Sequence, residues 1–466
     1  MRTPVFSCLR QPRGFYRRVA SLALPVVLQN LITTSLGFID TFMVGLLGSE
    51  EMSALTVANV PMFILQLVVF GLQSGSSVLI SQYWGKGDRK SINRVLGIGI
   101  FVAGGISALA ALVMCTAPQW VLYLITDNPR LVVLAMPYLR IVGVSYVFNA
   151  LASIYIGMQR STENPRFGML VFASSTVFNT LGNYILIFGK LGFPALGIRG
   201  AAIATLLARV LEFAVSAVYA LRSTRVPLQW RCIARPGMDI FRNFIKYSTP
   251  VLLNESLWGF GTSMFTVIMG HMAISTEIIS AQTIAGGIDR MITAGIFGVA
   301  AASAVIIGKE IGMGNRESTL AIGKALALVA LGAGIAVGLA EQLLFWLILR
   351  PFILPLFRLT PAAASICTTM VCCYSAAAPL NSLMTTVIVG ILRGGGDVHV
   401  SLLIDVVPLW VQVIPMLALF GLVLDVPVVW FCLVMTFESL VKTPFGLWRL
   451  LSGRWIHDVT GTAKVS

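Results

Sequence analysis

The chain has 466 residues, of which 57% are hydrophobic and only 11% are charged, and its formal net charge is +14. Soluble domains carry about 25% charged residues, so this composition excludes an ordinary soluble protein and indicates an integral membrane protein. The basic residues lie in short loops between apolar runs, without the pattern of a basic helix, a zinc finger or another nucleic-acid-binding module, which excludes a nucleic acid as the partner.

Charge-poor runs long enough to cross a bilayer, which takes about 20 residues, follow one another along the chain. We expect helices near residues 19–47, 53–82, 95–120, 131–158, 166–189 and 199–221, and then near 243–271, 278–307, 321–349, 362–392, 398–422 and 427–450. Residues 1–18 are interpreted as a basic interfacial segment and residues 451–466 as a cytoplasmic tail. The predicted fold class is therefore an all-α integral membrane protein with twelve transmembrane helices.

Lysine and arginine residues are distributed unevenly between the two ends of these helices. If the N-terminus lies in the cytoplasm, most basic residues fall on the cytoplasmic side. The opposite side then holds only Arg130, Lys190, Arg199, Arg350 and Arg358. Because basic loops favour the cytoplasmic side, we expect a multi-pass protein of the plasma (inner) membrane with both termini in the cytoplasm.

The two halves of the sequence resemble each other. "SALTVAN" at 53–59 matches "SAQTIAG" at 280–286, and "GKGDR" at 85–89 matches "GMGNR" at 312–316. Several matches in one order indicate an internal repeat, and an even number of helices gives both halves the same orientation. We expect two pseudo-symmetric six-helix bundles around a central cavity, which suits alternating access. The predicted domains are an N-lobe at 19–221, a cytoplasmic linker at 222–242 and a C-lobe at 243–450.

The double repeat occurs together with a set of short motifs. They are "LPVVLQN" and "GFIDTFMVG" in the first helix, "GKGDR", "GNYILIFG", "LGIRGAAIAT" and "ILRGGGD". In this combination the chain resembles the multidrug and toxic compound extrusion (MATE) transporters over about residues 15–450. The resemblance implies a monomeric antiporter that exports organic, often cationic, compounds against inward proton or sodium flow, with no cofactor beyond the coupling ion.

Acidic residues within the predicted helices are the candidates for coupling, because a charged side chain in the bilayer is costly and is usually functional. They are Asp40, Glu212, Glu255, Asp289, Glu341, Asp405 and Glu438. Two of them have a base three or four residues away on the same helix face, and we expect structural pairs of Glu212 with Arg209 and of Glu438 with Lys442. Glu341 is expected near the outer end of its helix, within reach of polar headgroups.

Asp40 has no base at these spacings in its own helix. It continues a polar seam formed by Asn30, Thr33 and Gly37, and a seam of this kind faces the interior of a bundle. Burial disfavours a charged carboxylate, whereas a bound cation favours it, so Asp40 is suited to exchange a proton or sodium ion. Pro25 lacks an N–H and is expected to act as a hinge in this helix.

The resemblance also implies partners for Asp40. Positions matching Asn179, Asn183 and Thr205 complete the N-lobe cation site of the family, and the first two lie four residues apart on one helix face. Many members have an aspartate where this chain has Asn183. A single carboxylate favours a proton over sodium, although the sequence leaves both coupling ions open.

Candidates for a C-lobe cation site are fewer and less regular. Glu255, whose nearest bases lie more than one helical turn away, resembles the cation-binding glutamate of the NorM-like branch. Asn381 occupies roughly the place of the second acid of that branch, and Asp289 resembles an acidic position of many members. Asp405 is a further candidate. Which lobe couples stays open at this stage.

Other functions fit the residues less well. An enzyme is excluded because the chain has no GxxxxGK[ST] loop, HExxH motif or serine elbow. The seven cysteines, which are Cys8, Cys115, Cys232, Cys367, Cys372, Cys373 and Cys432, form no CxxC pair, so we expect packing roles and no metal site. Two alternatives to the antiporter remain, namely a lipid-linked oligosaccharide flippase of the same superfamily and an uncoupled channel.

Overall fold

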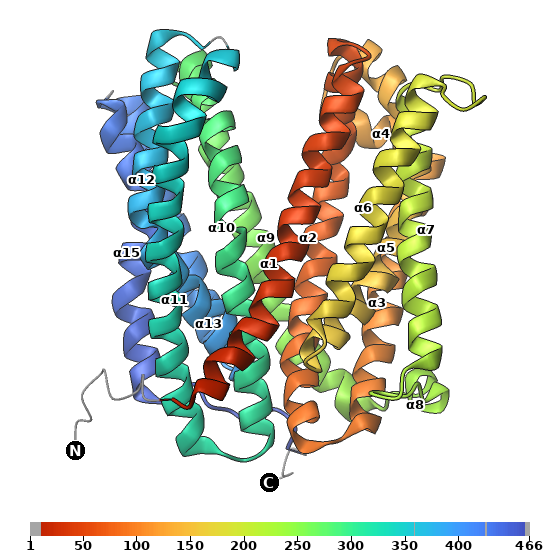
Figure 1. Ribbon diagram of the computed structural model, residues 1–466, viewed down its shortest axis with the longest axis vertical. Coiled ribbons are helices and arrows are strands. Elements are labelled where there is room, and N and C mark those ends of the chain that lie inside the picture. The colour runs from red at the N-terminus through yellow and green to blue at the C-terminus, as the bar shows by residue number, and fades with distance from the viewer. Residues whose placement is uncertain (1–10, 358, 425, 462–466) are drawn as a thin grey trace. The chain divides into compact units, whose positions relative to one another are not determined.

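The computed structural model describes residues 11–357, 359–424 and 426–461. Residues 1–10 of the predicted interfacial segment, with Cys8, lie outside these ranges, as do Arg358 and residues 462–466 of the predicted tail. Within the described residues every regular element is a helix and none is a strand, so the predicted all-α class is confirmed (Figure 1).

The helices follow one another with short connections. Their bounds are α1 Arg13–Gly45, α2 Ser49–Lys86, α3 Arg89–Thr116, α4 Pro118–Tyr123, α5 Pro129–Ser161, α6 Pro165–Phe188, α7 Ile198–Arg222, α8 Trp230–Ala234, α9 Met238–Gly270, α10 Ser275–Gly312, α11 Arg316–Leu344, η2 Phe345–Ile353, η3 Leu354–Phe357, α12 Pro361–Thr385, η4 Thr386–Leu392, α13 Val398–Pro408, η5 Leu409–Val413, α14 Ile414–Ala418, η6 Leu419–Val423 and α15 Val428–Ser452.

The predicted membrane spans reappear as long helices. Eleven helical segments of the described chain are long and apolar enough to cross a membrane. The predicted span at 243–271 lies in α9, which has 33 residues but a more polar composition, with Asn254 and Glu255 in its middle. Two short helices, α4 and α8, were not predicted, and α8 falls within the predicted linker.

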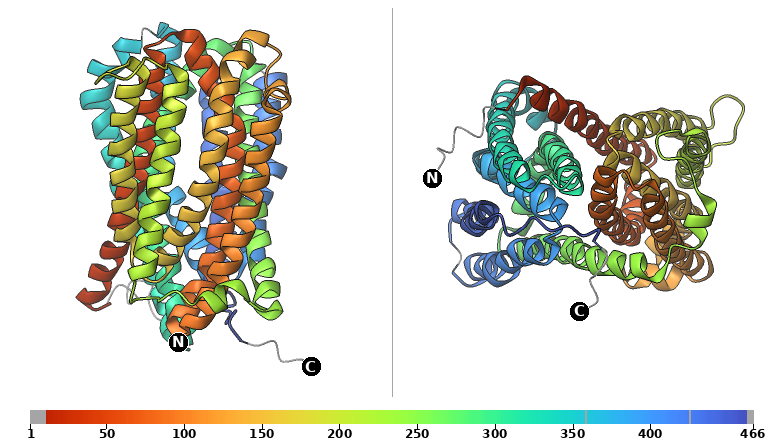
Figure 2. Two further views of the ribbon diagram at one scale, coloured as in Figure 1. Left: turned by 90° about the vertical axis from the view of Figure 1, so that its right-hand side faces the viewer. Right: turned by 90° about the horizontal axis from the view of Figure 1, so that it is seen from below.

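One compact unit consists of Leu28–Leu252. At its centre α5 packs against α2, α3, α6 and α7, and these long helices run side by side (Figures 1 and 2). The short helix α8 packs on α3 at Gly97, where an added Cβ would lie 2.4 Å from the Ile233 carbonyl oxygen. The absence of a side chain at Gly97 therefore lets α8 lie directly on α3.

The other compact unit consists of Met1–Val27 and Leu253–Ser466. Here α12 packs against α10, α11 and α15, the same central place that α5 has in the first unit. Both α1 and α9 are divided between the units, α1 after Val27 and α9 after Leu252. The predicted lobes, residues 19–221 and 243–450, divide neither of these helices between them. These predicted domain boundaries stay a prediction.

The internal repeat appears in the backbone conformation as well as in the amino-acid sequence. Gly87 and Gly314, which occupy the same place in the two matching motifs, both have a left-handed backbone, with φ of 73° and 82°. A residue with a side chain adopts such a conformation at a cost, so glycine is preferred at both turns. The two matching motifs therefore form the same kind of turn after α2 and after α10.

Candidate functional site

Asp40 lies in a cluster of neutral polar side chains within Leu28–Leu252. Asn183 Nδ2 donates to Asp40 Oδ1 at 2.5 Å and also lies 3.1 Å from Asn179 Oδ1. Asn179 Nδ2 is 3.4 Å from Thr205 Oγ1. If the Asn179 amide is turned over, its nitrogen donates to Asp40 Oδ1 at 2.8 Å. The structure therefore brings together all four residues that the sequence grouped as an N-lobe site.

The amide partners of Asp40 are buried, Asp40 itself is half-buried, and the base that acts on it is already engaged. Asn179 and Asn183 are 1% and 0% exposed. Arg209, which acts on Asp40 electrostatically, holds Glu212 with Nη1 at 2.7 Å from Oε1 and 2.9 Å from Oε2. The predicted pair of Glu212 with Arg209 is thus confirmed. Asp40 itself is met by amide N–H donors, and this carboxylate can take up one proton or one monovalent cation.

Pro25 lies inside α1, fifteen residues before Asp40. On both sides of Pro25 the helix packs closely on α10, where a Cβ added at Gly298 would lie 2.4 Å from Val27 Cγ2 and 2.9 Å from the Ala23 carbonyl oxygen. Because proline removes one helical hydrogen bond, α1 has a weak point at this close contact with α10. Its role as a hinge stays a prediction.

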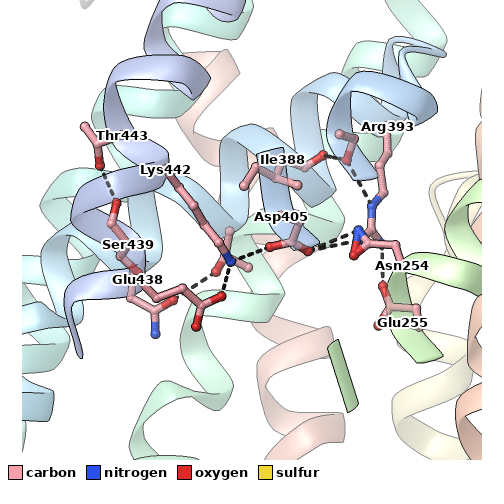
Figure 3. Close-up of polar contacts among 12 residues, drawn as sticks. Asn254, Glu255, Ile388, Arg393, Asp405, Glu438, Ser439, Lys442 and Thr443 are labelled. Carbon is pink, nitrogen blue, oxygen red and sulfur yellow. Dashed lines mark hydrogen bonds and ion pairs between the residues drawn. The ribbon is translucent and has the colours of Figure 1, made fainter. Parts of the chain in front are cut away.

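The other unit contains a chain of buried ion pairs (Figure 3). Arg393 Nη1 lies 2.5 Å from Glu255 Oε1, and its Nη2 lies 3.7 Å from Asp405 Oδ2. Lys442 Nζ lies 2.7 Å from Asp405 Oδ1 and also bonds Glu438, as its spacing predicted. Asp405 thus stands between two bases, and we call Glu255, Arg393, Asp405, Lys442 and Glu438 the ion-pair chain.

Asn254 supports this ion-pair chain from α9. Its Nδ2 donates to Asp405 Oδ2 at 3.1 Å (Figure 3). Arg393 Nε lies 3.4 Å from Ser401 Oγ. Arg393 and Lys442 are 2% and 5% exposed. Two buried bases therefore face three carboxylates that are themselves largely covered.

The expectation that Glu255 has no base within reach is wrong. Its partner Arg393 is 138 residues away in sequence and was assigned to a cytoplasmic loop, but it turns inward beyond the end of η4. Glu255 therefore has a cation supplied by the protein itself. Glu255 is therefore not an unpaired carboxylate that is available to bind a coupling ion.

The remaining C-lobe candidates lie outside the ion-pair chain. Asp289 on α10 is half-buried, and Asn381 on α12 is exposed and accepts from Thr385 Oγ1 at 3.2 Å. Among the described residues, neither side chain has a hydrogen bond or ion pair to Glu255 or Asp405. The structure thus joins two of the four predicted C-lobe residues and separates the other two from them.

Glu341 was expected near headgroups, and this expectation is wrong. The side chain is 0% exposed, and α11 continues without a break through the π-helix η2, which ends at Ile353, twelve residues after Glu341.

Comparison with protein families decides the identity of the chain. A family model described as MatE matches residues 25–185 and 250–419, which is most of the sequence and both halves of the repeat. The chain belongs to the MatE family. MatE proteins are transporters and not enzymes, so this chain is a multi-pass membrane transporter.

Relatives and solved structures resemble this MatE transporter over almost their whole length. A probable multidrug resistance protein NorM of Thermotoga maritima is 22% identical over 94% of the chain and 93% of its own length. The uncharacterized transporter YisQ of Bacillus subtilis is 24% identical over 91% of both chains. The outward-facing structure of a multidrug resistance MATE family transporter has a TM-score of 0.83 at 19% identity and covers 97% of this chain and 99% of its own. At this identity the likeness shows the fold alone, and it confirms two six-helix halves.

Sequence reasoning missed two features of this MatE transporter. Arg393 aligns with Arg160 in the repeat ("IVGILR" with "YIGMQR"), and this match was a signal that both arginines belong to helical packing. The second partner of Lys442, which is Asp405, comes from another helix 37 residues away. No local spacing could have indicated that contact.

Proposed function

We propose that this MatE protein is a cation-coupled antiporter that exports organic, often cationic, drugs or metabolites by alternating access. The proposed coupling ion is a proton, with sodium as the alternative, and no other cofactor takes part. We further propose that the protein works as a monomer in the plasma membrane with both termini in the cytoplasm. The name of the Thermotoga maritima relative, a probable multidrug resistance protein, supports the class of substrate.

The observation that carries this proposal is the environment of Asp40. A carboxylate in a membrane helix is costly and persists where it binds something. Asp40 is held by the amide of Asn183 at 2.5 Å, and the nearby Arg209 is occupied by Glu212. Its charge can therefore be cancelled by a proton without breaking an ion pair.

The amide nitrogens that face Asp40 offer sodium no ligand, and this supports a proton as the coupling ion. A metal cation is bound by oxygen ligands, whereas an N–H group directed at the carboxylate cannot serve as one. Asn183 presents its nitrogen, and Asn179 does the same when its amide is turned over. We therefore assign the coupling proton to Asp40, with Asn179, Asn183 and Thr205 as its supports and Pro25 as the hinge.

The ion-pair chain supports a different role for the C-lobe candidates. Glu255 and Asp405 are already matched by Arg393 and Lys442, so we propose that they hold α9, α13 and α15 together. Under this proposal Glu255, Asp289, Asp405 and Asn381 do not form one ion site.

The alternatives require features that are weaker here. A flippase for lipid-linked oligosaccharides needs several free bases to bind pyrophosphate, but Arg209, Arg393 and Lys442 are each engaged by carboxylates. Of the arginines within the helices that were expected to be unpaired, Arg140 and Arg290 remain. The family comparisons do not favour it either. An uncoupled channel gives no reason to keep Asp40 within the bilayer.

The proposal is tested by uptake of ethidium, a fluorescent organic cation, into proteoliposomes. Two gradients are applied separately. One is a pH gradient with an acidic interior, and the other is a sodium gradient with the higher concentration inside. The wild type and the exposed control Asp127→Asn should take up ethidium under the pH gradient, whereas Asp40→Asn should not. Glu255→Gln should keep its response to the pH gradient. Indifference of the wild type to both gradients, or normal uptake by Asp40→Asn, would contradict the proposal.

A further inference from the structure

Glu341 is a buried acid to which the proposed function assigns no role. It is 0% exposed, and neither of its carboxylate oxygens has a hydrogen-bonding partner among the described residues. Burying an ionised carboxylate without a partner costs several kcal/mol at the least, and such groups become neutral instead. A carboxyl group in this environment either destabilises the fold as a carboxylate or is protonated.

The packing of α11 explains why Glu341 cannot turn away to lipid. Gly334 and Gly338 bring α11 against α12, where an added Cβ would lie 2.6 Å from Ser382 Cβ and 2.4 Å from the Ser375 carbonyl oxygen, respectively. Glu341 follows Gly338 by three residues and shares its face of the helix. The close glycine contact therefore holds the carboxyl group inside the helical bundle.

The helix that packs on α11 beside Glu341 carries another acid. α10 contacts α11, where a Cβ added at Gly295 would lie 3.8 Å from Val337 Cγ2, and Asp289 lies on α10 within two turns of Gly295. Asp289 acts on Glu341 electrostatically and is half-buried rather than enclosed. Arg290, the residue after Asp289, acts on Asp289 electrostatically, but its side chain is exposed and donates through Nε to the Gly286 carbonyl oxygen at 3.2 Å. Two neighbouring carboxyl groups resist being charged together, so one proton shared between them relieves both.

Other titratable groups on the helices around α11 do not supply a base to Glu341. Tyr374 of α12 donates to Gln282 Oε1 at 2.6 Å, and Arg350 of η2 lies over the Trp346 ring at 4.2 Å. Lys442 of α15 is held in the ion-pair chain. Tyr374 is itself acted on electrostatically by Asp289, Cys373 and Cys432. Cys372 acts on Cys373 in turn, and none of these groups is a base.

We propose that Glu341 and Asp289 form a second proton site of this transporter, separate from Asp40, in which Glu341 holds one exchangeable proton. On release, the proton leaves the Glu341 carboxyl for the Asp289 carboxylate, and Asp289 then passes it to water on its exposed side. Glu341 becomes the carboxylate and Asp289 transiently the acid, so charge and protons balance. The transport consequence rests on the proposed proton coupling, but the presence of the proton does not.

The first test detects the proton directly and needs no substrate. Infrared difference spectra of the full chain in lipid nanodiscs are recorded between neutral and alkaline pH, with and without ¹³C-labelled glutamate. We expect a protonated-carboxyl band at neutral pH that moves with the glutamate label, is lost in Glu341→Gln and remains in Glu317→Gln, an exposed control on the same helix. Asp289→Asn should displace this band. Since the labelled wild type needs no substitution, a folding defect in a variant does not remove the test.

Absence of a glutamate band that titrates in the wild type would overturn the proposal, and so would a band unchanged in folded Glu341→Gln. Addition of sodium chloride at neutral pH should leave the band in place, and its loss would show a sodium site instead. In proteoliposomes, Glu341→Gln should lower the number of protons moved per ethidium. A wild type that moves no ethidium would contradict the proposed function while the infrared result still decides the proton site.

Discussion

Replacing Arg393 by methionine should strongly destabilise the unit that contains α9–α15. Arg393 is 2% exposed and stands 2.5 Å from Glu255 and 3.7 Å from Asp405. Without it, Lys442 is left as the base of the ion-pair chain against three carboxylates. Removing one partner of a buried pair costs about 3–5 kcal/mol, because the other charge stays buried. Since the side chains of Glu255 and Asp405 are 14% and 15% exposed, we expect a value near the lower end.

The free energy of unfolding in mixed detergent micelles measures this effect. The matched control is Arg316→Met on α11 of the same unit, where the arginine side chain is exposed. A substitution at an exposed site of this kind usually changes stability by about 0.5 kcal/mol or less. The double variant Arg393→Met with Glu255→Gln should recover part of the loss. If Arg393→Met were as stable as Arg316→Met, the ion-pair chain would not hold these helices together.

Three further predictions concern the other unit and the hinge. Asn183→Asp adds a second carboxylate beside the first, so a sodium gradient should begin to drive ethidium uptake, and an unchanged preference for protons would contradict this reading. Gly75→Ala places a Cβ 2.5 Å from Ser248 Cα and should lower the free energy of unfolding by about 1–3 kcal/mol, whereas Gly105→Ala meets nothing within 4 Å and should not. Pro25→Ala restores a backbone N–H and should slow transport without reducing the amount of folded protein, as measured by initial uptake rates and size-exclusion chromatography.

The parts of the fold that were predicted correctly depend on local patterns. Membrane helices are recognised from continuous apolar runs, and the pairs of Glu212 with Arg209 and of Glu438 with Lys442 follow from spacings of three and four residues. The cluster around Asn183 was suggested only by resemblance to a family, and the structure brings its members together. That result concerns geometry, and the ion that binds there stays a prediction.

The parts that were missed depend on distant packing. Arg393 reaches Glu255 across 138 residues, and hydropathy alone places an arginine beside a glycine-rich loop at the membrane surface. The position of Glu341 along its helix depends on where that helix ends, and the predicted span at 321–349 ended four residues before Ile353, with Pro351 inside the observed helix. A proline normally disrupts a helix, but here the helix continues with a wider turn through η2.

The most direct measurement of the central claim is proton release when ethidium binds. Ethidium is added to the purified transporter in weakly buffered detergent solution, and the pH of the solution is followed with an indicator dye. The account predicts release of about one proton per chain from the N-lobe site in the wild type, and a smaller release from Asp40→Asn under the same conditions. Equal release from both proteins, or saturable binding of ethidium without any release, would contradict it.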